Sequence, residues 1–183
     1  MVKEIVGIIL GGLIVNNYAF GNLLGIVPVV GGKTCSRKAL FTGLAITLVM
    51  LLTQAIAWPL ESFVIAKLGL GGMRIFAYVL IVLIVTYLLE AIVKGACKES
   101  LGLYFPVIAL NGAVLGLALN NAGAAFGEAM LAAAFAGLGY TVAMLVFAGV
   151  QGRIQQKYVP AAFRGLPASI LAAAIVSMAI MAF

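Results

Sequence analysis

Thiols are the side chains of this sequence best suited to bind a metal or to react, and the chain has two of them. Cys35 and Cys97 each lie in a segment rich in Lys and Arg. Two thiolates do not complete the four-thiolate set of an iron–sulfur cluster, and no histidine is present to supplement them. We therefore expect no metal site from this chain alone. Free reduced thiols are the favoured interpretation, and the alternatives are a displaced metal site shared with a partner or a redox-sensitive pair.

The most notable ionisable residue is Glu90, which follows a long apolar run. A carboxylate within an apolar segment is costly unless it is paired or hydrated. Lys94 lies four residues further on, so the favoured interpretation is a Glu–Lys pair on one helix face near a membrane interface. A role for Glu90 in an ion path is the alternative.

Amides, glycines and prolines interrupt two of the apolar runs, in the first half and in the second half of the chain. The interruptions are Val15-Asn16-Asn17 with Asn22 and Gly25-Ile26-Val27-Pro28, and Pro106 with Leu110-Asn111-Gly112 and Asn120-Asn121. Asparagines that only hydrogen-bond between helices would account for part of this pattern. The symmetric placement favours broken helices whose exposed backbone lines a central site.

The elements that must position these residues are membrane-spanning helices. Of the 183 residues, 65% are hydrophobic and 9% are charged, which is too little polar material to cover a water-soluble globule. A span needs roughly 20 apolar residues to cross the hydrocarbon core. Six uncharged runs serve as candidates, at 5–32, 39–60, 75–89, 100–127, 129–152 and 165–183. The third is short and spans if Arg74 and Lys94 lie at the two interfaces. We predict an all-α integral membrane protein with six transmembrane helices.

Basic residues predict the orientation of these helices. Eight basic residues lie in connections expected on one side of the membrane: Lys33, Arg37, Lys38, Lys94, Lys98, Arg153, Lys157 and Arg164. Three are expected on the other side: Lys3, Lys67 and Arg74. Because positive connections stay in the cytoplasm, both termini are expected outside it. The formal charge of +6 is explained in this way, and no nucleic-acid partner is expected.

An internal repeat links the second run to the fifth at an offset of 94 residues. Six residues recur without a gap: Phe41, Gly43, Leu44, Thr47, Met50 and Leu51 correspond to Phe135, Gly137, Leu138, Thr141, Met144 and Leu145. Three helices per half is an odd number, so the two halves would enter the membrane from opposite sides. We expect one membrane domain over 1–183, made of inverted repeats at about 1–95 and 96–183, with the first and fourth helices broken.

Several of these segments together resemble a known family. The chain looks like the A subunit of the Rnf electron transport complex, a sister of the D and E subunits of the sodium-pumping quinone reductase. The resemblance covers nearly the whole chain and rests on the order and spacing of Val15-Asn16-Asn17, Leu24-Gly25-Ile26 with Pro28 and Gly31, Gly43-Leu44-Ala45, Ala57-Trp58, Glu90, Leu101-Gly102 with Tyr104 and Pro106, Asn111 with Ala113-Val114-Leu115-Gly116, Ala148-Gly149 with Arg153, Pro160-Ala161 and Phe163-Arg164-Gly165.

The resemblance implies a complex that passes electrons between ferredoxin and NAD while it moves Na⁺ or H⁺. It implies further Rnf subunits as partners, including an inverted sister subunit of the E type. In such pairs a [2Fe-2S] cluster is held by two cysteines from each subunit, and those positions are Val27 and Gly112 here. Neither side chain ligates iron. We predict no cofactor held by this chain, although Asn16, Asn17 and Asn111 lie beside the substituted positions.

Three functions compete at this point. The leading hypothesis is a membrane subunit of an ion-translocating oxidoreductase in a bacterial or archaeal cytoplasmic (inner) membrane, not catalytic when isolated. A stand-alone secondary carrier or channel is the second, because inverted repeats with broken helices also describe transporters. The third is a structural relative that has lost its cluster and supports assembly of the complex. A soluble enzyme is excluded by composition.

Overall fold

The computed structural model describes residues 36–69, 71–96, 111–154, 159–160 and 163–181. Every regular element in these ranges is helical. The longer elements are α3 (Ser36–Leu60), α5 (Arg74–Ala96), α7 (Gly112–Asn120), α8 (Phe126–Arg153) and α9 (Leu166–Met181), and the short ones are a π-helical turn (Glu61–Ile65), α4 (Ala66–Leu68) and a 3₁₀ turn (Gly71–Met73). The predicted helical class is therefore confirmed for the part of the chain that is described.

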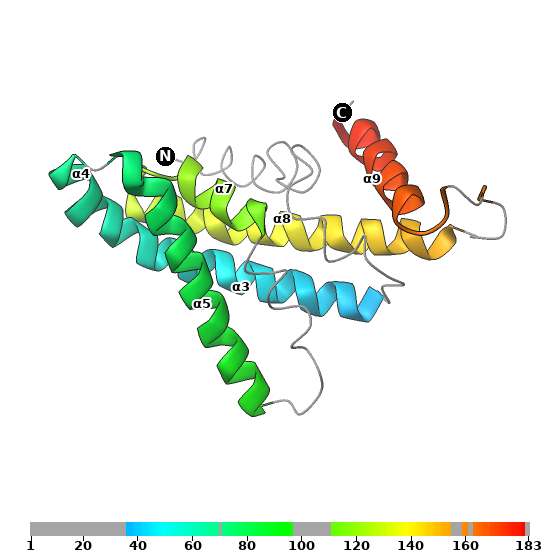
Figure 1. Cartoon of the computed structure of the whole chain (residues 1–183), viewed down its shortest axis with the longest axis horizontal. Helices are drawn as coiled ribbons and strands as arrows, with labels where there is room; N and C mark the ends of the chain where they lie inside the picture. Colours follow the sequence, from blue (N-terminus) through cyan, green and yellow to red (C-terminus); the bar gives the residue numbers. More distant parts are fainter. Residues whose placement is uncertain (1–35, 70, 97–110, 155–158, 161–162, 182–183) are drawn as a thin grey trace.

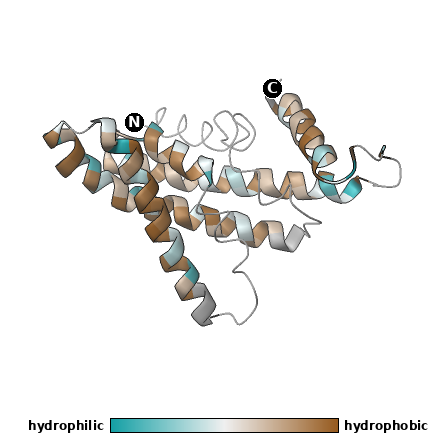
Figure 2. Cartoon of the chain, in the orientation of Figure 1, coloured by the Kyte–Doolittle hydropathy of each residue, from teal (hydrophilic) through white to brown (hydrophobic). Residues whose placement is uncertain are grey.

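Within the residues that the structure describes, three of the predicted spans are long and apolar enough, by length and composition, to cross a membrane. They are Ala39–Leu68, Gly71–Ile92 and Phe126–Arg153, while Leu166–Ile180 is a shorter apolar helix. The second span runs beyond its uncharged run, which ends at residue 60, because the helix continues through Glu61. Figure 2 shows apolar residues over most of α5 and α9. The first predicted helix lies outside the described residues, so the six-helix inverted repeat stays a prediction.

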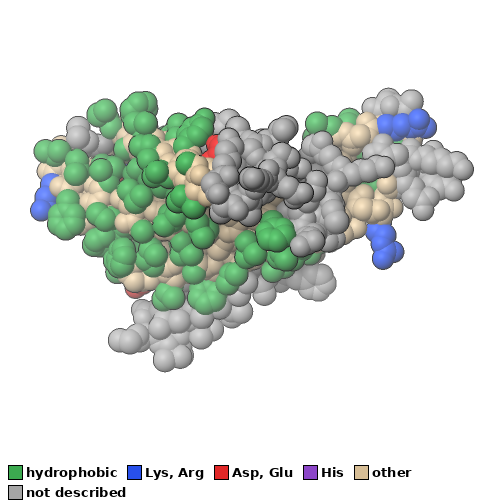
Figure 3. Space-filling model, turned by 90° about the horizontal axis from the view of Figure 1, so that it is seen from below, with side chains coloured by type: hydrophobic (Ala, Val, Ile, Leu, Met, Phe, Trp, Pro, Cys, Tyr) green, Lys and Arg blue, Asp and Glu red, His purple; other side chains and the backbone are tan. Residues whose placement is uncertain are grey.

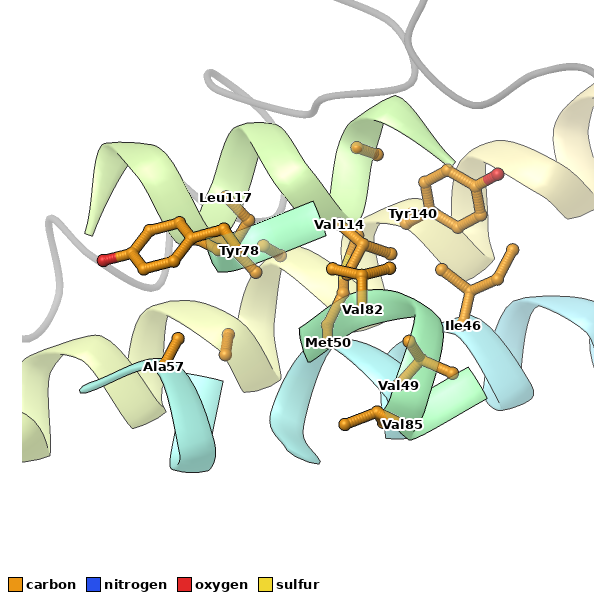
Figure 4. Close-up of a cluster of buried hydrophobic side chains, with 14 of the residues drawn as sticks. Ile46, Val49, Met50, Ala57, Tyr78, Val82, Val85, Val114, Leu117 and Tyr140 are labelled. Atoms are coloured by element: carbon orange, nitrogen blue, oxygen red, sulfur yellow. The ribbon is translucent and has the colours of Figure 1, made fainter. Parts of the chain in front are cut away.

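The helices α3 and α8 form the centre of the fold. They run side by side in opposite directions (Figure 1), and α5 and α7 pack against α3. Their shared core contains Ile46, Val49 and Met50 of α3, Tyr78, Val82 and Val85 of α5, Val114 and Leu117 of α7, and Tyr140 of α8 (Figure 4). Large apolar side chains cover much of the face seen in Figure 3, as expected for a surface that lies in lipid.

Two side-chain hydrogen bonds connect the ends of these helices to neighbouring segments. The indole N–H of Trp58 donates to the Ala124 carbonyl at 2.9 Å, and its ring meets Phe126 edge to face at 5.2 Å between centroids. The end of α3 is thereby joined to the turn between α7 and α8. At the other end of α8, the Gln151 amide donates to the Ser169 hydroxyl at 2.9 Å and holds α9.

Candidate functional site

The start of α7 lies at one of the positions singled out in the sequence. Asn111 is extended (φ −74°, ψ 110°) and caps the helix, since its Oδ1 accepts from the Ala113 N–H at 2.9 Å. Its Nδ2 donates to the Tyr140 hydroxyl at 3.1 Å. Asn111 is 3% exposed, so this amide is buried in the interior of the bundle. A helix therefore begins at Gly112, where the sequence predicts an interruption, and residues 97–110 lie outside the described part.

Four residues of the internal repeat meet where α3 crosses α8: Gly43, Thr47, Gly137 and Thr141. The Thr47 and Thr141 hydroxyl oxygens lie 3.1 Å apart, and each also lies at hydrogen-bonding distance from a carbonyl of its own helix, that of Gly43 or Gly137. With one hydrogen each, the two hydroxyls satisfy two of these three contacts at a time.

Both glycines at this crossing are needed for close approach of the backbones. A Cβ at Gly43 would lie 2.9 Å from the Thr141 Cα, and a Cβ at Gly137 would lie 2.9 Å from the Thr47 Cα. The contact between Gly43 and Thr141 is therefore equivalent to the contact between Gly137 and Thr47. This reciprocity is the relation expected where a local two-fold axis passes between the two threonines.

A buried carboxylate lies at the end of the bundle where α4 turns towards α5. Glu61 is 6% exposed. Its Oε1 accepts from Arg74 Nη2, and its Oε2 accepts from Arg74 Nε at 3.1 Å and from the Tyr78 hydroxyl at 2.9 Å. The Arg74 side chain is 37% exposed, so it extends from the surface to the buried carboxylate. The carboxylate is paired and hydrogen-bonded, as a charge within a membrane protein requires.

Glu61 is not among the residues singled out in the sequence, because charged residues served there as the ends of spans. Pro59 lies inside α3, and the π-helical turn that follows shifts the helical register, with the Ala66 N–H bonded to the Glu61 carbonyl. The sequence feature that could have indicated this pair is the short separation of 13 positions between Glu61 and Arg74, in a chain with five acidic residues in all.

The remaining predicted site residues are only partly described. Glu90 is half-buried on α5 and takes part in an interaction, while the side chain of Lys94 lies outside the description. Val27, Asn16, Asn17, Cys35 and Cys97 lie outside the described residues. Within the described ranges, no group of three or more His, Cys, Asp or Glu side chains is placed to hold a metal.

Comparison with known proteins identifies the family. Residues 5–183 match the profile described as "Rnf-Nqr subunit, membrane protein". The chain belongs to the Rnf-Nqr family. The resemblance noted in the sequence is thereby confirmed.

Curated relatives of similar length accompany this match. The chain is similar to the A subunit of the ion-translocating oxidoreductase complex of Azoarcus sp. (strain BH72), 35% identical over 96% of this chain and 94% of the relative. It is also similar to the protein of the same name from Syntrophotalea carbinolica, 33% identical over 99% and 96%. A third relative is the A subunit of the Na⁺-translocating ferredoxin:NAD⁺ oxidoreductase complex of Acetobacterium woodii, 33% identical over 96% and 94%.

Membership of the Rnf-Nqr family, together with several long apolar helices, makes this chain a multi-pass membrane protein. Its buried polar groups therefore lie in a bundle surrounded by lipid. In the part of the chain that is described, the Asn111 cap, the Thr47–Thr141 contact and the Glu61–Arg74 pair are buried polar features that tie helices of this Rnf-Nqr protein together.

Proposed function

We propose that this chain is the A-type membrane subunit of an Rnf-type, ion-translocating oxidoreductase, and that it frames the transmembrane electron path without being catalytic alone. The observation that carries the proposal is the family match over residues 5–183, with relatives of the same extent named as the A subunit of such complexes. The Acetobacterium woodii relative is named for Na⁺, ferredoxin and NAD⁺. We assign the same electron donor and acceptor to this chain's complex, with Na⁺ or H⁺ as the ion.

The proposed architecture is a pair of inverted three-helix repeats, at about 1–95 and 96–183. It is supported by the reciprocal contact at Thr47 and Thr141, since corresponding residues of the two repeats meet each other across antiparallel helices. An inverted sister subunit of the E type and other Rnf subunits are the proposed partners. The membrane is the cytoplasmic (inner) membrane, with both termini outside the cytoplasm, as the distribution of basic residues favours.

This chain is proposed to hold no iron–sulfur cluster at the position used by the family it resembles. Gly112 brings only backbone to the start of α7. Asn111 does not replace a thiolate there, because both ends of its amide are engaged with Ala113 and Tyr140. The donor set at this position therefore does not fit the cluster.

Deletion of the gene in its host, with complementation from a plasmid, tests the proposed function. Membranes from the deletion strain should lose ferredoxin-dependent NAD⁺ reduction and the ion uptake coupled to it, and the wild-type gene should restore both. Unchanged activity in the deletion strain would contradict the proposal.

A cluster-less structural subunit is the second candidate function, and the lack of a ligand at Gly112 favours it. It predicts a different outcome of the same experiment. The other subunits would then fail to assemble in the deletion strain, and a variant chain that restores assembly would restore electron transfer fully, whatever its substitutions in the membrane interior.

A further inference from the structure

The helix that begins as α3 and continues into α4 is longer than a membrane requires. Its apolar part, Ala39–Leu68, has 30 residues, which is about 45 Å at a rise of ~1.5 Å per residue, whereas the hydrocarbon core is roughly 30 Å thick. In the proposed topology Lys38 lies at the cytoplasmic interface, so the core ends about 20 residues later, near Trp58. The Trp58 ring contacts Phe126, the first residue of α8, and α4 lies past this level at the end of the molecule (Figure 1).

The helix α5 gives the same boundary independently. Arg74 and Lys94 lie about 20 residues apart, as expected for the two ends of one span. The Arg74 guanidinium holds both carboxylate oxygens of Glu61, so the outer end of the span in α5 lies level with the residues just after Trp58 in α3. Leu68 follows Glu61 by about 10 Å of helix, and the headgroup layer on each side is about 5–8 Å thick. The connection between the two helices therefore lies outside the lipid tails, and its tip reaches the outer edge of the headgroups.

This connection, residues 62–69 and 71–73 of the described chain, is here called the outer hairpin, and it exposes large apolar side chains. Phe63 is 61% exposed, Leu68 is 65% exposed and Met73 is 56% exposed. Within the hydrocarbon core such side chains would face lipid tails, but at this level they face headgroups and water. Large apolar side chains that gather on a surface in water mark a site of interaction.

A positive charge lies beside this apolar surface. Lys67 is exposed and is the only charged residue between positions 62 and 73. Its Nζ lies over the Phe63 ring, 5.3 Å from the ring centroid, and this cation–π contact holds the ammonium group next to the apolar side chains. The nearby carboxylate of Glu61 is bound by Arg74 and does not neutralise Lys67. The outer hairpin therefore complements an apolar protein surface with an acidic rim.

The outer hairpin is held in place at its tip and at its base. Gly69 adopts the left-handed conformation (φ 66°, ψ 21°) that ends α4 and reverses the chain. At the base, the Glu61 carboxylate accepts hydrogen bonds from Arg74 of the following helix and from the Tyr78 hydroxyl. A surface that is ordered before it binds loses little conformational entropy on binding.

We propose that the outer hairpin is a docking surface for an acidic, water-exposed domain of another subunit of the complex, on the extracytoplasmic side of the membrane. Carboxylates of the partner bind Lys67, and its apolar side chains cover Phe63, Leu68 and Met73. A protein domain is favoured over lipid because the tip extends past the lipid tails, where a partner in water is needed to cover apolar side chains. The inference rests on the proposed function, which supplies the other subunits and the orientation of the chain.

The test places a photo-crosslinking amino acid at the position of Leu68 or of Met73, with the chain in its whole complex in membranes of the host. Illumination should join this chain to a different subunit of the complex. Mass spectrometry of the adduct should map the attachment to a water-exposed segment that contains Asp or Glu within a few residues. The same probe at Leu80, which is 44% exposed on α5 within the span, is the matched control and should label lipid.

Reversal of the charge at Lys67 tests the acidic rim. With the probe at Met73, Lys67→Glu should lower the yield of the adduct about fivefold or more, because it places like charges against each other. Glu128→Gln is the matched control, since it removes an exposed charge from the first turn of α8 at the same end of the bundle. It should leave the yield within about twofold of the parent.

Three outcomes would overturn the inference: an adduct with lipid alone, an adduct with a second copy of this chain, or a yield that Lys67→Glu leaves unchanged. Each of them leaves the proposed function intact where ferredoxin-dependent NAD⁺ reduction still depends on this chain. Failure of the proposed function has a separate sign, because the deletion strain would then keep that activity whether or not the adduct forms.

Discussion

The hydroxyl oxygens of Thr47 and Thr141, which are separated by 94 residues, lie 3.1 Å from each other where α3 crosses α8. The residues are partners in the internal repeat and partners in space. Corresponding residues contact each other directly only near the axis that relates two halves of a structure. The contact therefore marks the place about which the proposed repeats are arranged, and substitutions there should affect both halves alike.

Gly43→Ala and Gly137→Ala should each destabilise the protein by about 1–3 kcal/mol, because the added methyl group meets the backbone of the facing helix. The two losses should be similar, since the two environments are reciprocal. Thermal unfolding of the purified protein in detergent measures them. Gly149→Ala is the matched control on α8, where nothing lies within 4 Å of the new carbon, and it should gain up to about 1 kcal/mol from helix propensity. Equal behaviour of Gly137→Ala and Gly149→Ala would show that α3 and α8 are not in close contact.

Removal of the amide at Asn111 should cost more stability than removal of the hydroxyl at Tyr140. Asn111→Ala loses the cap on α7 and the hydrogen bond to Tyr140, for about 2–3 kcal/mol, whereas Tyr140→Phe keeps the cap and loses the hydrogen bond from Asn111, for about 1 kcal/mol. Thermal unfolding of the two variants and of the double variant gives the order. A larger loss for Tyr140→Phe would show that the cap contributes little.

The cofactor prediction concerns Val27 and Gly112. Val27→Cys with Gly112→Cys, co-expressed with a sister subunit that supplies two cysteines, should create cluster absorption and an electron paramagnetic resonance signal that the parent pair lacks. Val27→Ser with Gly112→Ser is the control, because it adds polar atoms of similar size without thiolates. A cluster signal between these subunits in the unmodified complex would refute the prediction, and Cys35 and Cys97 would then be the first ligands to substitute.

The topology prediction follows from the basic residues of the connections. Reporter fusions at the two termini should show activity typical of the outside of the cytoplasm, and a fusion at Arg153 should show activity typical of the inside. Replacing Arg153 and Arg164 by Gln should weaken the orientation of the second half. A cytoplasmic location of either terminus would contradict the inverted arrangement.

The sequence by itself determined that this protein lies in lipid, and it determined three of its membrane spans and its family. Those conclusions depend on composition and on the order of residues: lipid demands long apolar helices with few charges, as found at Ala39–Leu68, Gly71–Ile92 and Phe126–Arg153. It also showed that Thr47 corresponds to Thr141. It did not show that the two side chains meet, because an internal repeat states which residues are equivalent and not where the axis between them passes.

Only the tertiary structure decided the role of Glu61. In the sequence it ends an uncharged run and resembles an exposed charge at a helix end. In the fold the π-helical turn after Pro59 continues the helix, and the reversal of the chain at Gly69 brings Arg74 and Tyr78 back onto the carboxylate. Burial of a charge depends on which partners the neighbouring helix delivers. That information lies in the packing of α3 against α5 and not in the local pattern of either segment.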